Sequence, residues 1–174
     1  MKARARFFGH PIHQMLIPIP FGLFVTGILL DVVARVVDLD ALTIVSFWNL
    51  TIGVGTGVLA AIFGLIDYTA IPKRTRARRI GAVHGIGNAI VIALLAGALW
   101  QRADMRFFGV PDLAFGLEIA ALVLAGVTGW LGGELVDRLG IGVEPDAHPD
   151  APSSLGKHAH EKPRTTLPYG ASRA

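Results

Sequence analysis

Six polar side chains near one end of the apolar stretches of this chain are of types that bind metals. They are His10, His13, Asp67, His84, Asn88 and Glu134. Imidazole nitrogens and carboxylates ligate transition metals, and one or two axial imidazoles hold the iron of haem b. Polar groups are costly in apolar surroundings, so several at one level indicate a function. We therefore expect a shared histidine and carboxylate site.

The spacing of these residues predicts which of them share a face. His84 and Asn88 are four residues apart and lie on one face of a helix. His10 and His13 are three apart and would align on a helix, while Pro18 and Pro20 interrupt the helical hydrogen bonds that follow. We expect a kink or a short interfacial helix that carries both histidines, with a cavity beside the broken backbone.

The ligand stays open at this level. His13 and His84 are the leading metal ligands or axial haem ligands, with His10 as the rival. The other three polar groups would support the ligands or lie beside the haem propionates. Spacing does not separate haem b from a transition metal ion or from no cofactor. Without a cofactor, the histidines would bond to headgroups, backbone or water, and the carboxylates would reach the interface or pair with Arg79 or Arg138.

A second polar layer lies toward the other end of the apolar stretches and contains Asp31, Asn49 and Glu118. We interpret Asp31 as an interhelical hydrogen-bond partner or a pH-sensitive group. A small proton-linked transporter would use Asp31, Glu118 and the first layer as relay stations. Four short helices leave little space for a substrate path, so that function would require a homo-oligomer.

The elements that must position both layers are helices in a membrane. Residues 7–30, 41–66, 80–101 and 119–133 contain no Asp, Glu, Lys or Arg, and the mean hydropathy of the chain is +0.55. With its apolar flanks each stretch reaches the roughly 20 residues that cross a bilayer as a helix. We predict an all-α, antiparallel four-helix membrane bundle over residues 1–143, with helices near 16–37, 44–67, 80–101 and 113–136. Residues 144–174 lack periodicity and are expected to form a disordered cytosolic tail.

Basic residues predict the orientation. Nine of them lie before the first helix, in the second connection and after the fourth helix: Lys2, Arg4, Arg6, Lys73, Arg74, Arg76, Arg78, Arg79 and Arg138. We assign only Arg35, Arg102 and Arg106 to the other two connections. Under the positive-inside rule both termini are cytoplasmic, and the basic connection lies against anionic headgroups. The net charge of +3 therefore reflects topology, and we expect no nucleic-acid partner.

Several classes of site are excluded or lack their motif. The chain has no cysteine, which excludes disulfides, cysteine-ligated iron–sulfur clusters and covalently attached c-type haem. It contains no nucleophile elbow, P-loop or zincin motif. A short similarity joins residues 6–11 to residues 106–111, each ahead of a helix. Because it stops at the proline, we interpret it as two aromatic lead-ins and not as a duplication.

Several motifs together carry a resemblance to a known family. They are GHPIH at 9–13, PIPFG at 18–22, GLID at 64–67, RIGAVHGIGN at 79–88 and GWLGGELV at 129–136. Over about residues 7–143 the chain resembles the bacterial transmembrane family catalogued as domain of unknown function 2231, which implies the bacterial inner membrane. Relatives in which a similar bundle is joined to Rieske-type or cytochrome-type domains imply membrane redox chemistry. This chain has no such fusion, so a quinone or a redox protein would have to be its partner.

Three functions of different classes follow. The first is a haem-binding or metal-binding electron-transfer protein of the membrane. The second is a structural or accessory membrane protein in which the first polar layer is a hydrogen-bonded brace. The third is the proton-linked transporter.

Overall fold

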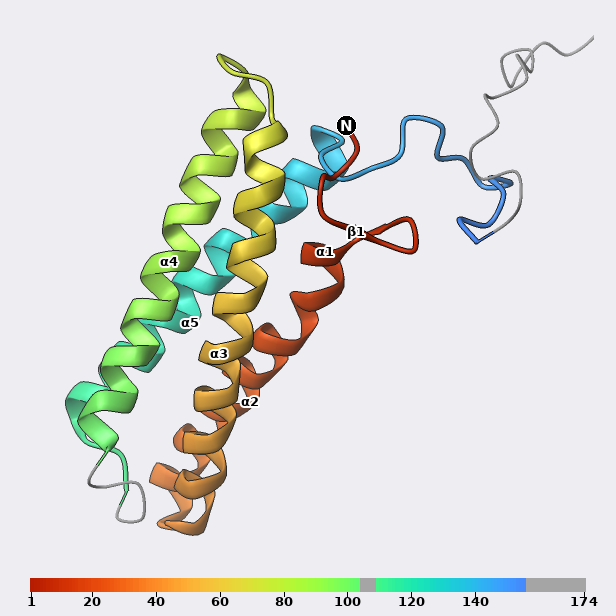
Figure 1. Cartoon of the computed structure of the whole chain (residues 1–174). Coiled ribbons are helices and arrows are strands. Elements are labelled where there is room, and N and C mark those ends of the chain that lie inside the picture. The colour runs from red at the N-terminus through yellow and green to blue at the C-terminus, as the bar shows by residue number, and fades with distance from the viewer. Residues whose placement is uncertain (104–108, 156–174) are drawn as a thin grey trace, which may run out of the picture.

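The computed structural model describes residues 1–103 and 109–155, and within these residues four long helices form an antiparallel bundle (Figure 1). The helices are α2 (Pro18–Val37), α3 (Ala41–Ala70), α4 (Arg76–Arg102) and α5 (Asp112–Gly133). This confirms the predicted fold class. Part of the second lead-in, 104–108, and of the tail, 156–174, lies outside the described residues.

The surface of the bundle is apolar, as expected of helices in lipid. Leu65, Trp100 and Trp130 are 64%, 81% and 68% exposed. In the described residues four helical segments are long and apolar enough to cross a membrane: Ile12–Val37, Ala41–Ala70, Arg76–Arg102 and Asp112–Arg138. Because helices satisfy their own backbone hydrogen bonds, they can expose such side chains to hydrocarbon.

The segment before α2 departs from the predicted helix with two histidines. A two-stranded hairpin pairs β1 (Arg6–Phe7) with β2 (His10–Pro11), and α1 (Ile12–Leu16) follows. Phe8 and Gly9 have φ of +46° and +90°, which closes the turn. His10 therefore lies in a strand, and only His13 lies on the short helix. A non-glycine residue with positive φ is uncommon, so the sequence pattern did not reveal this turn.

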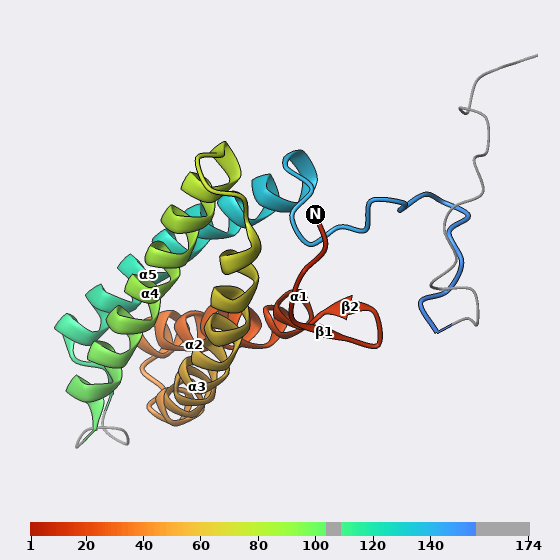
Figure 2. The same ribbon diagram turned by 45° about the horizontal axis from the view of Figure 1, so that its top comes forward.

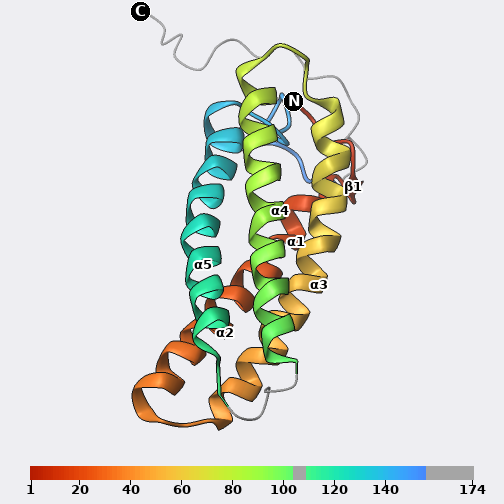
Figure 3. The ribbon, with the colours of Figure 1, turned by 90° about the vertical axis from the view of Figure 1, so that its left-hand side faces the viewer.

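The bundle consists of two antiparallel helix pairs. In Figure 1, α2 lies beside α3, and Figures 1 and 3 both show α4 beside α5. Both pairs begin at the same end, and α3 also packs against α4. The buried core that joins them is made of Phe24, Ile28, Leu50, Val91, Leu95, Ala121 and Ala125.

The two pairs bury equivalent positions. His84 follows His13 by the 71 residues that also separate Arg102 from Asp31. With the same offset, the buried residues Pro20, Phe24 and Gly27 of α2 correspond to the buried residues Val91, Leu95 and Ala98 of α4.

Helices α3 and α5 correspond in the same way. Every position from 46 to 65 falls in the same exposure class as its counterpart from 114 to 133. The chain is thus a tandem of two similar helix pairs. The tandem is not apparent in the sequence, since α3 and α5 share few identical residues.

At the end of the bundle where the chain begins, the N-terminal segment contacts the residues that follow α5. Helix α5 continues into a π-helical turn, η1 (Glu134–Arg138), and residues 139–155 return past the hairpin (Figure 2). Glu144 pairs with Lys2 at 2.7 Å and with Arg6. The hydrogen bond from Lys2, with Arg6 adding to it, holds the pKa of the Glu144 carboxyl below its usual value.

Candidate functional site

His13 of α1 and His84 of α4 face each other across the tandem. Their ring centroids are 6.5 Å apart and the ring planes are nearly perpendicular, at 89°. Nδ1 of His13 lies 2.8 Å from the carbonyl oxygen of Ala60, and Nδ1 of His84 lies 2.8 Å from that of Thr128. Ala60 and Thr128 are equivalent positions of α3 and α5. Each pair therefore holds one imidazole in the same way.

A glycine makes room for each ring. A Cβ added to Gly64 would lie 2.8 Å from Cε1 of His13, and one added to Gly132 would lie 3.1 Å from Cε1 of His84. Gly64 and Gly132 also occupy equivalent positions, one helical turn after the two carbonyl acceptors. Any larger residue would push the ring away from its carbonyl, so these glycines position the imidazoles.

Asn88 links His84 to the neighbouring helix. Its Nδ2 donates to the carbonyl oxygen of His84 at 2.8 Å and lies 3.2 Å from Nε2 of the same ring. Its Oδ1 accepts a hydrogen bond from the Thr128 hydroxyl at 3.1 Å. The face shared by His84 and Asn88, which their spacing predicted, is therefore directed at α5. We call His13, His84 and Asn88 the imidazole site.

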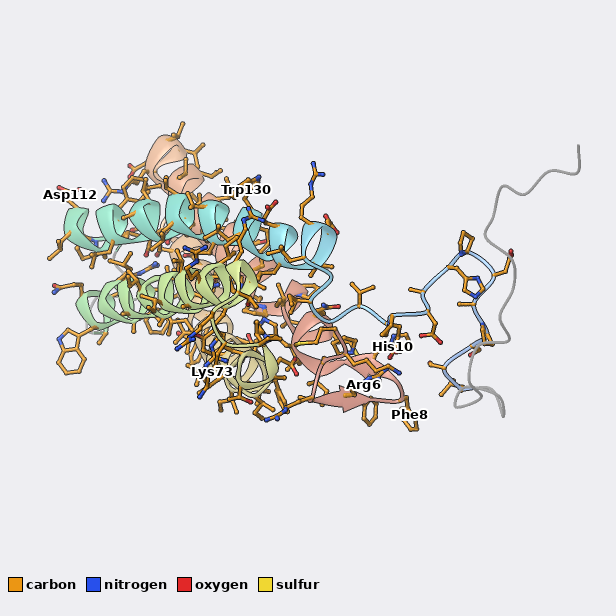
Figure 4. All side chains as sticks on the ribbon, turned by 90° about the horizontal axis from the view of Figure 1, so that it is seen from above. Arg6, Phe8, His10, Lys73, Asp112 and Trp130 are labelled. Carbon is orange, nitrogen blue, oxygen red and sulfur yellow. The ribbon has the colours of Figure 1, made fainter. Side chains whose placement is uncertain are left out.

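The other three residues of the expected site lie elsewhere. His10 is exposed on the hairpin, outside the bundle, where its Nε2 lies 3.3 Å from the Ser154 hydroxyl (Figure 4). Asp67 accepts from the backbone amides of Arg4 and Ala5 at 2.7 and 2.9 Å. Glu134 pairs with Arg76 at 2.6 Å. Asp67 therefore fastens the N-terminal segment, and Glu134 fastens the start of α4 to the end of α5.

The imidazole site shares one feature with metal-binding histidines, the contact between one ring nitrogen and a backbone carbonyl. Metal-binding histidines usually donate their other ring N–H to a carbonyl or carboxylate, which fixes the ring and leaves the second nitrogen for the metal. A metal held by both rings would be bound through the two Nε2 atoms, because Nδ1 of each ring lies against a carbonyl oxygen. No group of three or more histidine, cysteine or acidic residues that could hold a metal occurs in the described part of the chain.

A second polar cluster lies at the opposite end of the bundle, roughly 27 Å along the helices from the imidazole site. Nη1 of Arg102 donates to Asp31 Oδ2 at 2.6 Å and to Glu118 Oε1 at 2.7 Å. All three side chains are completely buried. We call Asp31, Arg102 and Glu118 the ionic cluster.

Helix α3 adds two polar contacts to the ionic cluster. The Ser46 hydroxyl donates to Asp31, and the carbonyl oxygen of Thr43 accepts from Arg102 Nη2 at 2.9 Å. Within the described residues, Nε of Arg102 and Oε2 of Glu118 have no hydrogen-bond partner. All four helices thus contribute to the surroundings of one guanidinium, and Oε2 of Glu118 is the carboxyl oxygen without a partner in the residues described.

The ionic cluster differs from the predicted layer in two residues, Arg102 and Asn49. Arg102 was assigned to a connection, but it ends α4 in the interior. The signal was available, because Arg102 continues the buried spacing of Val91, Leu95 and Ala98, and lies opposite two intramembrane acids. Asn49, expected in this layer, packs against Gly27 instead.

The comparisons with known proteins concern the whole bundle. The model of a family described as predicted membrane protein (DUF2231) matches residues 9–145, which include both polar sites and all four long helices. No curated protein and no solved structure matches the chain. The matched region is most of the chain, and it has the apolar helices that the family's description requires. The chain therefore belongs to the DUF2231 family of membrane proteins.

Proposed function

We propose that His13 and His84 bind one metal centre, the iron of haem b or a transition metal ion, and that the protein transfers electrons in the membrane. The observation that supports this is the pair of facing imidazoles, 6.5 Å apart, each tied through Nδ1 to a backbone carbonyl. His10, the rival ligand, lies exposed on the hairpin.

The surroundings of the rings also fix their positions. Each ring fills the space that a Cβ would take at Gly64 or Gly132. Haem iron held by both imidazoles would supply one-electron transfer. The chain itself would orient both rings and exclude water. The partner would be a quinone or a redox protein that approaches the cytoplasmic face, if the basic residues orient the chain as expected.

The test is an absorption spectrum and metal analysis of the full chain, purified in detergent from iron-replete cells. A Soret band would identify haem, whereas a metal without a Soret band would identify a bare ion. His13→Ala and His84→Ala should each remove the bound group. His10→Ala is the matched control and should retain it. A colourless and metal-free wild-type protein would contradict the proposal.

The second candidate function, a structural brace, is favoured by one contact. Asn88 Nδ2 lies 3.2 Å from Nε2 of His84, the atom that a metal would need. If the imidazole site binds a metal, Asn88→Ala frees this nitrogen, and metal content is kept. If the site is a brace, the same variant only loses hydrogen bonds, and His84→Gln remains folded and active in cells.

A further inference from the structure

The charges of the ionic cluster do not balance. Two carboxyl groups, Asp31 and Glu118, share the single guanidinium of Arg102, and all three side chains are completely buried. A buried charge without a partner costs several kcal/mol, so a net negative cluster in a membrane needs one more cation.

One oxygen atom of Glu118 marks the position where a further positive charge would bind. Oε2 of Glu118 has no hydrogen-bond partner within the described residues, although Oε1 of the same group is paired with Arg102. Nη1 of Arg102 donates to both Asp31 Oδ2 and Glu118 Oε1, so one nitrogen brings the two carboxyl groups together. Ionised carboxylates only accept hydrogen bonds, so a hydrogen bond between two such groups requires that one of them is protonated.

A proton fits this position better than a metal ion. Nη1 of Arg102 lies 2.6 and 2.7 Å from the two acids, so a second full cation between them would be repelled by the guanidinium at short range. Two acids that share one proton are a known solution to this problem in protein interiors.

Water outside the bundle can come close to the cluster. A pocket of about 330 Å³ at the same end is lined by Ala34, Arg35, Asp38, Asp40, Thr43 and residues 109–112. Thr43 both lines this pocket and accepts a hydrogen bond from Arg102 through its carbonyl oxygen. One residue therefore separates the pocket from the guanidinium.

We propose that the ionic cluster is a proton-binding site, in which Asp31 and Glu118 share one exchangeable proton that reaches them from the pocket beside Thr43. The charged groups facing the cluster are Arg102 from α4 and the two acids from α2 and α5, while α3 contributes only neutral groups. Arg35, Asp38, Asp40 and Asp112 line the pocket outside it. The site is independent of the metal proposal, since it lies at the other end of the bundle.

Infrared spectroscopy of the full chain in lipid nanodiscs tests the proposal. A protonated carboxyl group has a carbonyl band that a carboxylate lacks, and the band shifts in heavy water if the proton exchanges. We expect this band at neutral pH, and we expect its loss in both Glu118→Gln and Asp31→Asn. Asp112→Asn, which changes an exposed acid of the pocket, should keep it.

A second measurement remains informative even if the infrared band is weak. Glutamine is close in shape to a protonated glutamate, so Glu118→Gln should leave the unfolding midpoint nearly unchanged at neutral pH. A large fall in that midpoint would show that Glu118 carries a charge that Arg102 needs. Either that fall or the absence of a protonated carboxyl band in the wild type would overturn the proposal.

Discussion

Each end of this bundle holds a pair of residues at equivalent positions of the tandem, and the two pairs differ in chemistry. At one end, His13 and His84 are half-buried imidazoles, and each lies against a backbone carbonyl of the neighbouring helix. At the other end, Asp31 and Arg102 occupy another pair of equivalent positions and are completely buried in direct contact.

Under the proposed function, this difference separates binding from stability within one framework. The ions are held by one another, because a buried charge is tolerated only when it is paired. The rings are held by backbone carbonyls through Nδ1, and Asn88 adds a contact at Nε2 of His84. We therefore expect changes at the ionic cluster to affect mainly folding, and changes at the imidazole site to affect mainly binding.

The largest effect should come from Arg102→Met. This variant leaves two buried acids without their cation and should lower the free energy of unfolding by about 3–5 kcal/mol. Equilibrium unfolding in detergent, followed by circular dichroism, measures the change. Arg35→Met is the matched control, because Arg35 pairs with the exposed Asp112 at 2.9 Å and should cost only about 0–1 kcal/mol. Equal costs for the two variants would remove the distinction between buried and surface ions.

Gly64→Ala should have a smaller effect on stability and a clear effect on binding. The new Cβ would lie 2.8 Å from the ring of His13 and would displace it from the carbonyl of Ala60. Losing that hydrogen bond costs about 1 kcal/mol, whereas a displaced ligand should abolish metal retention. Metal content and unfolding of the same preparation measure both quantities. Gly133→Ala, where an added Cβ meets nothing within 4 Å, should change neither.

The smallest effect should come from Glu144→Gln, which removes the ion pairs with Lys2 and Arg6. The pKa of Glu144 is lowered by Lys2, so its ion pairs stabilise the closed hairpin above the ordinary glutamate pKa. This stability is lost as the pH falls through the lowered value, and for a surface pair it is less than about 1 kcal/mol.

Hydrogen exchange of the Ile12 amide, which bonds to Ala5 at 3.0 Å, reports this closure. After correction for intrinsic rates, protection in the wild type should decrease at acid pH. In Glu144→Gln it should already be low at neutral pH. Unchanged protection in the variant would mean that these surface ions do not hold the hairpin.

The sequence was sufficient for the helices because charge-free length alone decides whether a segment spans a bilayer. The stretch 80–101 lies within α4, and 44–67 lies within α3. The hairpin was not predictable, since it depends on a positive φ at Phe8.

The candidate site was predictable only where it depended on spacing along one helix. His84 and Asn88 share a face, as four-residue spacing requires. The ionic cluster was missed because Arg102 lies at the end of an apolar stretch, where a charge usually reaches the interface. Its spacing from Val91, Leu95 and Ala98 places it on the inner face of α4, and its contacts with Asp31 and Glu118 from other helices show that it is buried.

The central claim, that His13 and His84 bind the same metal centre, is tested most directly by a double-mutant comparison of bound metal. Haem and metals should be measured per chain in the wild type, His13→Ala, His84→Ala and the double variant. Two ligands of one ion act as a unit, so each single variant should lose as much as the double variant. A wild type without metal, or single variants that each keep part of it while only the double variant loses all, would contradict the claim.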